Sequence, residues 1–481
     1  MPADLAFGIH ERSVVAALLI KNGTVVNADA QSAADVLVDR GVIARVGPAL
    51  DAAADTVLDA SGLYVLPGGI DAHTHLDMPA GAIRSSDDFE TGTMAAAYGG
   101  TTTIIDFATP ERGQELGRAL DAWMGLAGGR ALIDYAFHMV VPEWRDGTAA
   151  EMDRLVQRGV TSFKLFMAYP GRLMLDDGAI FRALRCTRGN GGLVALHAEN
   201  GAVIDVLVQE ALALGRTAPK FHARTRPAGA EGEAIRRAIA LAEMAGAPVY
   251  IVHVSSAEGV AAIARARERG VPVHAETCPQ YLCLSDAEYD RPGFDAAKFV
   301  ISPPLRPPED QDALWEGLAE GVLDVVATDH CPFGMDDPPH KRLGLSDFSK
   351  IPNGAPGIET RLLLLWDQGV RTGRISPSRF VEVTAAAPSK IFGLWPRKGA
   401  IAAGSDADLV LWDPSARTTI SASTHHMRVD YSLYEGRTVT GAPVTVVSRG
   451  EVIIDRGTVT GRKGRGVYLS RTPRARPAGG P

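Results

Sequence analysis

Hydrophobic and polar positions divide the chain into segments with different periodicities. Near its start, residues 18–26, 34–47 and 56–68 are short runs rich in branched apolar side chains, and Asn22-Gly23 and Arg40-Gly41 fall between such runs, where hairpin turns belong. A matching pattern returns at residues 407–414 and 438–460. Two separated segments of the same character predict one small β-sandwich assembled from both ends of the chain.

Between these segments, strand-like apolar runs alternate with helical stretches. The eight runs are residues 65–75, 101–108, 132–141, 160–169, 192–200, 248–256, 271–278 and 323–331, and helical patterns include residues 89–97, 147–158, 231–245 and 257–269. Eight β/α cycles over roughly 270 residues predict an α/β fold, a TIM (β/α)8 barrel. A doubly wound open sheet is the alternative, but the Gly-rich phosphate fingerprint expected after its first strand is missing.

These patterns predict four parts of the chain. They are an N-terminal extension (1–14), a β-sandwich domain (15–66 plus 396–468), a metal-dependent barrel catalytic domain (67–395) and a flexible tail (469–481). The one basic cluster lies at residues 462–476, and we expect it to be solvated because its surroundings are rich in proline and glycine.

Composition excludes several partners. The 49 basic and 57 acidic side chains give a net charge of −8, which provides no electrostatic footprint for nucleic acid or anionic lipid. We find no apolar run of the ~18 residues that a membrane span requires, and no secretory signal. The four cysteines include no C-x-x-C pair, which favours a reducing cytoplasm.

The candidate chemistry lies at the ends of the predicted barrel strands. His73 and His75 are separated by one residue, so both point to the same face of the first strand and can ligate one metal ion. Alone, such a pair could equally be two polar residues at a strand end. Three further strands carry His197, His253 and Asp329 where they reach the C-terminal face, on which barrel enzymes build their sites. Together they predict a metal site.

Lys164 lies inside the apolar strand TSFKLFMAY, where an unpaired ammonium is costly to bury. It could pair with an acid across the barrel. Alternatively, burial lowers its pKa, and the neutral amine reacts with carbon dioxide to give a carbamate that bridges two metal ions.

With these residues, the chain resembles the dihydropyrimidinase/hydantoinase family of the amidohydrolase superfamily. The resemblance covers residues 18 to 468 and includes PGGIDAHTHLDMP, FKLFMAY, LHAENG, IVHVSS, AETCPQYL, SPPLR, ATDHCPF and KIPNGAPGIE. It implies metal-dependent hydrolysis of the cyclic amide bond of dihydropyrimidines or hydantoins to N-carbamoyl amino acids. It also implies a small cyclic ureide or imide as the substrate, and a homotetramer.

The resemblance further implies roles for individual residues. Two divalent metal ions, zinc by preference, would be bridged by N6-carboxylated Lys164, with His73, His75 and Asp329 on one ion and His197 and His253 on the other. Asp329 would also move a proton from the attacking water to the leaving ring nitrogen. Tyr169 would hydrogen-bond the developing oxyanion, and backbone groups at Ser302 and Asn353 would bind the cyclic amide. Without the resemblance, Tyr169 could be a packing aromatic at the rim.

Some positions depart from related families or from the common family pattern. Ala80 and Leu173 stand where many members carry aromatic residues, which predicts a roomier pocket for the ring substituent. Asp77 stands where a dihydroorotase would carry an arginine to hold a substrate carboxylate. Alternative functions are an allantoinase-like ureide hydrolase and a non-catalytic dihydropyrimidinase-like scaffold, which would have lost metal ligands.

Overall fold

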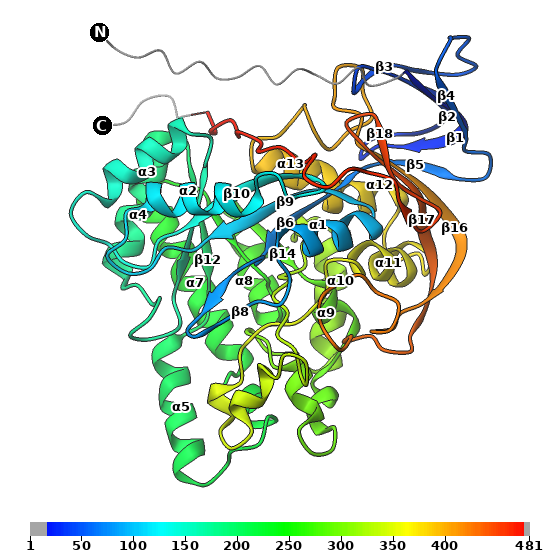
Figure 1. Ribbon diagram of the computed structural model, residues 1–481. Coiled ribbons are helices and arrows are strands. Elements are labelled where there is room, and N and C mark those ends of the chain that lie inside the picture. The colour runs from blue at the N-terminus through cyan, green and yellow to red at the C-terminus, as the bar shows by residue number, and fades with distance from the viewer. Residues whose placement is uncertain (1–16, 476–481) are drawn as a thin grey trace.

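The computed structural model describes residues 17–475, and its centre is a barrel of eight parallel strands in chain order (Figure 1). The strands are β6 (Gly69–Thr74), β9 (Thr101–Ala108), β10 (Asp134–Val140), β11 (Ser162–Phe166), β12 (Leu193–His197), β13 (Val249–Ile251), β14 (Val273–Thr277) and β15 (Val325–Val326). The predicted barrel is confirmed. The expected extension at residues 1–14 lies outside the described residues.

Helices surround the barrel. They are α1 (Phe89–Tyr98), α2 (Leu116–Ala127), α3 (Thr148–Gln157), α4 (Asp177–Asn190), α5 (Gly201–Ala213), α6 (Phe221–Arg224), α7 (Ala228–Ala245), α8 (Ala257–Glu268), α9 (Pro279–Cys283), α10 (Pro308–Ala319), α11 (Arg361–Leu365), α12 (Pro377–Val381) and α13 (Ala387–Ile391). The amphipathic α4 is typical: the side chain of Asp176 caps its N-terminus by accepting from the Ala179 N–H at 2.7 Å, and the helix buries Ile180 and Leu184 on one face.

The barrel closes between β6 and the short β15 through side chains. The Asp71 carboxylate accepts hydrogen bonds from the N–H and hydroxyl of Thr328 at 3.1 and 2.6 Å. The buried Arg361 guanidinium donates to the carbonyls of Ile70 and Val326 at 3.0 and 2.9 Å. Further along, the His75 N–H donates to the His330 carbonyl at 2.9 Å. The closure therefore places the end of β6 beside the segment that follows β15.

Both ends of the chain contribute to a second, mixed sheet. Its nine strands are β1 (Leu18–Val26), β2 (Gln31–Asp39), β3 (Val42–Gly47), β4 (Thr56–Asp59), β5 (Tyr64–Pro67), β16 (Leu409–Thr419), β17 (Thr438–Ser448), β18 (Glu451–Asp455) and β19 (Thr458–Val459). Strand β5 lies between β1 and β16, and the two terminal segments share one hydrophobic core. The predicted all-β unit thus forms from both termini, as one continuous sheet.

The predicted strand at residues 65–75 divides at Gly68, between β5 of the terminal sheet and β6 of the barrel. A side chain at Gly68 would meet Thr102, because a Cβ built there lies 2.1 Å from its hydroxyl oxygen. Only glycine therefore allows the chain to pass from one sheet to the other at this point.

A buried charge cluster joins the two sheets. The Lys398 ammonium lies 2.8 Å from Asp134, 3.1 Å from Asp406 and 2.6 Å from Asp408. These carboxylates raise the pKa of Lys398 above its usual value, so the side chain stays charged despite its burial.

The expectation of a flexible tail from residue 469 is wrong for residues 469–475, and residues 476–481 lie outside the described part. Leu469 is fully buried, and its N–H donates to the Tyr135 carbonyl at 2.8 Å. Arg471 is also buried and donates to the Ser162 hydroxyl at 2.8 Å. Leu469 packs with Phe392 and Leu394 in the core inside the barrel. This segment is held by apolar packing and backbone hydrogen bonds, which could not be predicted from its basic composition.

Among residues 17–475, no helix combines the length and the hydropathy needed to cross a membrane.

Candidate metal centre and substrate pocket

His73, His75 and Asp329 form a compact group at the closure of the barrel. The Nε2 atoms of the two histidines are 3.2 Å apart, and each lies 3.1 Å from Asp329 Oδ1. These three residues offer ligand atoms that all lie within 4.8 Å of one another. Asp329 has a positive φ of 53°, a strained conformation for a residue other than glycine, and such strain is typical of functional sites.

His197 and His253 form a second pair next to the first group. His197 Nδ1 and His253 Nε2 lie 3.0 Å apart, and the His253 ring centre is 5.5 Å from that of His73. Burial holds the pKa of His253 well below its usual value and lowers the pKa of His75 to about 4. Both imidazoles are therefore neutral near pH 7, which is the form that binds metals.

Lys164 extends from β11 toward both groups. Its side chain is buried, and its Nζ lies 5.0 Å from the ring centre of Phe107 and 5.2 Å from that of Phe166. Among residues 17–475, it forms no ion pair within 4.0 Å, so the interpretation of Lys164 as one half of a buried pair is not supported. Burial lowers its pKa to about 8, which increases the fraction of reactive neutral amine.

The donor set fits a divalent metal ion. Imidazole nitrogens that face each other at 3.0 and 3.2 Å cannot both direct protons into the gap, whereas a shared cation satisfies their lone pairs. Neutral imidazole and carboxylate together are typical ligands of zinc and other first-row metals. The structure thus brings the predicted ligands together in two adjoining groups beside Lys164.

Two buried glutamates orient the histidines, and the sequence analysis missed both. Glu276 on β14 accepts from His73 Nδ1 and, at 2.6 Å, from the Tyr250 hydroxyl. Glu199 accepts from His197 Nε2 at 2.8 Å. The signal for Glu199 was present in the sequence: it lies two residues after His197, so both side chains are expected on one face. Such carboxylates fix the tautomer and raise the basicity of ligating histidines.

The three predicted substrate contacts also converge. The Ser302 hydroxyl donates to Glu199 at 2.8 Å, and Asn353 Nδ2 lies 3.5 Å from the Tyr169 hydroxyl. The Tyr169 ring centre is 5.3 Å from that of His197. Burial raises the pKa of Tyr169, so its hydroxyl keeps the proton that an oxyanion donor needs.

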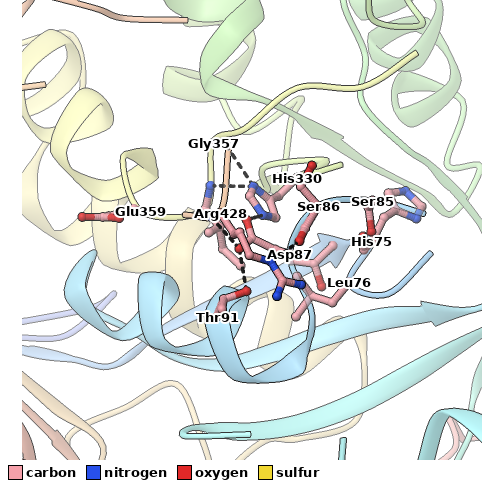
Figure 2. Close-up of polar contacts among 12 residues, drawn as sticks. His75, Leu76, Ser85, Ser86, Asp87, Thr91, His330, Gly357, Glu359 and Arg428 are labelled. Carbon is pink, nitrogen blue, oxygen red and sulfur yellow. Dashed lines mark hydrogen bonds and ion pairs between the residues drawn. The ribbon is translucent and has the colours of Figure 1, made fainter. Parts of the chain in front are cut away.

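His330, next to Asp329, anchors a loop through the network in Figure 2. Its Nε2 lies 3.0 Å from the buried Asp87 carboxylate, and its Nδ1 accepts from the Gly357 N–H at 3.1 Å. Asp87 in turn accepts from the backbone N–H of Arg428 at 2.8 Å. His330 therefore connects the strand-end group to the loop after Asn353 and to the C-terminal part of the chain.

The chain matches known proteins over almost its whole length. Residues 64–453 match the model of the amidohydrolase family. The chain is 54% identical to a D-hydantoinase of Streptomyces coelicolor, with 95% of this chain and 98% of the relative covered, and 49% identical to one of Geobacillus stearothermophilus, with 94% and 96% covered. The crystal structure of a dihydropyrimidinase from Brevibacillus agri has a TM-score of 0.94 at 49% identity, covering 96% of this chain and all of that one.

Glu276→Gln tests the orienting carboxylates. We expect the affinity of the site for divalent metal to fall roughly 10–100-fold, because a neutral amide would no longer supply the charge that makes His73 a stronger ligand. Competition with a chromogenic chelator would measure the change. Glu233→Gln, which removes a half-exposed partner of Arg237, is the control and should bind metal as the wild type does. Unchanged affinity in Glu276→Gln would contradict the role assigned to this residue.

Proposed function

The chain belongs to the amidohydrolase family and is a cyclic amidohydrolase, and from that premise we propose that it opens hydantoins and dihydropyrimidines to N-carbamoyl amino acids. One observation carries the proposal: four neutral or carboxylate-paired histidines and Asp329 surround the buried Lys164 at the C-terminal face of the barrel. Relatives that are about half identical over nearly the whole chain are named D-hydantoinase, which supports the same reaction.

We assign the candidate metal ligands as follows: His73, His75 and Asp329 would hold one divalent ion, His197 and His253 would hold a second, and a carbamate on Lys164 would serve both. Zinc suits these donors. The carbamate forms when the neutral Nζ bonds to the carbon of carbon dioxide and releases a proton, which the lowered pKa of Lys164 favours. When bound, the ions lower the pKa of a water molecule and polarise the ring carbonyl.

The protein's own groups perform the remaining steps. Asp329 accepts a proton from the attacking water and delivers it to the ring nitrogen as the amide bond breaks. The Tyr169 hydroxyl donates to the carbonyl oxygen as negative charge develops on it. Backbone groups of Ser302 and Asn353 bind the polar edge of the ring, which fits an uncharged cyclic amide.

The expected partner is a small cyclic ureide or imide, and we propose a cytoplasmic homotetramer. The four cysteines are free thiols, which supports a reducing compartment. The tetramer rests on the family resemblance alone, and light scattering that gave the mass of four chains would support it.

A hydrolysis panel tests the substrate class. We expect the enzyme to open dihydrouracil, dihydrothymine and 5-substituted hydantoins, and to discriminate against dihydroorotate by roughly a thousandfold or more, because Asp77 stands where a dihydroorotase would carry the arginine that pairs with the ring carboxylate. Ala80 and Leu173 favour small or aliphatic substituents at least as much as a phenyl group. Preferred hydrolysis of allantoin would favour the allantoinase alternative, and no hydrolysis by metal-loaded protein would favour the scaffold.

Lys164→Ala tests the bridging carbamate. We expect the variant to lose metal and activity together, because the site loses the ligand shared by both ions. The metal content, measured by elemental analysis, should fall from about two ions per subunit in the wild type. Short carboxylic acids should partly restore both the metal content and the activity. A metal-loaded, active wild-type crystal with an unmodified Lys164 would contradict the assignment.

Tyr169→Phe tests the oxyanion donor. We expect kcat to fall roughly 10²–10³-fold with metal content and thermal stability preserved, since only a hydrogen bond formed in the transition state is lost. Steady-state kinetics on a hydantoin measure this change. A wild-type kcat would make Tyr169 a packing residue.

A further inference from the structure

Lys341 is a buried lysine outside the metal centre whose ammonium is fully hydrogen-bonded. Its Nζ donates to the carbonyls of Val300 at 3.0 Å, Pro352 at 2.8 Å and Gly354 at 2.8 Å. An ammonium has three N–H donors, so these three acceptors use all of them. Burial lowers the pKa of Lys341 to about 7, and the three carbonyls supply the acceptors that its charged form needs.

The three acceptors belong to the two loops assigned to the substrate ring. Val300 precedes Ser302 by two residues, and Pro352 and Gly354 flank Asn353 on either side. The loops also contact each other, because the Gly354 N–H donates to the Val300 carbonyl at 3.1 Å. The Lys341 ammonium thus binds the backbone of both the Ser302 loop and the Asn353 loop.

Two other side chains hold the loop that contains Ser302. His222 Nε2 donates to the Ile301 carbonyl at 2.7 Å, and the Tyr281 hydroxyl donates to the Pro303 carbonyl at 2.8 Å. Within residues 17–475, the Ser302 carbonyl and the backbone N–H and carbonyl of Asn353 have no protein hydrogen-bond partner. The neighbouring carbonyls are occupied, and the groups left free are those expected to meet the ring.

Lys341 is held in place independently of the metal ligands. It begins the short 3-10 helix η3 (Lys341–Gly344), and its backbone N–H donates to the Gly334 carbonyl at 2.9 Å. At the other end of η3, Gly344 packs directly on Ile351, since a Cβ at Gly344 would lie 2.1 Å from the Ile351 side chain. The helix therefore packs against the same loop whose carbonyls its lysine binds.

We propose that Lys341 is a positioning residue that fixes the spacing of the Ser302 and Asn353 loops, and thereby the fit of the uncharged cyclic ureide ring between them. The inference rests on the proposed function, because it assumes that these loops bind the ring. The loops contact the edge of the ring rather than the reacting carbonyl. Losing their alignment should therefore weaken ground-state and transition-state binding alike and appear mainly in KM.

The test compares Lys341→Met with Lys350→Met in the metal-loaded enzyme, using the best substrate of the wild type. Lys350 lies at the start of the Asn353 loop, but its side chain is 68% exposed and pairs only with Asp347, so it is a matched control. We expect KM to rise at least tenfold in Lys341→Met, with kcat changed less than about threefold and metal content unchanged. Lys350→Met should match the wild type in all three.

Lys341→Gln covers the case in which the methionine variant does not fold, because an amide at this position keeps some of the donors. We expect a smaller rise in KM with metal retained. A KM within twofold of the wild type in a folded variant would overturn the proposal, and so would loss of metal together with activity, which would make Lys341 a support of the metal centre. If the wild-type enzyme opened no cyclic ureide, the proposed function itself would fail, which is a separate outcome.

Discussion

Closure of the barrel between β6 and β15 is the constraint on which the candidate site depends. β15 has only two residues, so a backbone ladder cannot close this gap alone, and Asp71 and Arg361 supply the missing hydrogen bonds. Both side chains are fully buried, and their charges face each other at 4.0 Å. Removing either would leave an uncompensated charge in the core, which typically costs several kcal/mol. The same closure brings the ends of β6 and β15 together, and with them His73, His75 and Asp329, the first group of candidate metal ligands.

Three buried lysines show how the surroundings decide what an amine can do. Lys398 meets carboxylates, which raise its pKa, and it remains a charged structural link. Lys341 meets three carbonyls and acts as a hydrogen-bond donor. Lys164 faces two phenyl rings and the histidine groups, while Asp329 is already engaged by His73 and His75. Lys164 is thus the one of the three that lies beside the candidate metal ligands, where the proposed carbamate would replace its positive charge with a ligand.

The sequence was sufficient for features with a local pattern. Strand periodicity predicted the barrel, and the H-x-H pair together with strand-end residues predicted a metal site from side chains that the structure brings together. It was insufficient where a residue acts through distant partners. Glu276 and Lys341 have ordinary local sequences, and their roles depend on contacts across the barrel and between loops. The C-terminal segment was misread for the same reason, since its burial depends on the underside of the barrel rather than on its own composition.

The candidate metal ligands and the proposed ring-binding groups are supported by different parts of the fold, which are strand ends and loops. The candidate metal ligands lie at strand ends that the closure of the barrel holds together, so a carbonyl attacked there would be positioned by the barrel itself. The proposed ring-binding loops are tied together by the Lys341 ammonium, and the hairpin of β7 (Pro79–Ala80) and β8 (Ile83–Arg84) is a separate element. Sequence changes in these loops can alter substituent preference without disturbing the metal ligands.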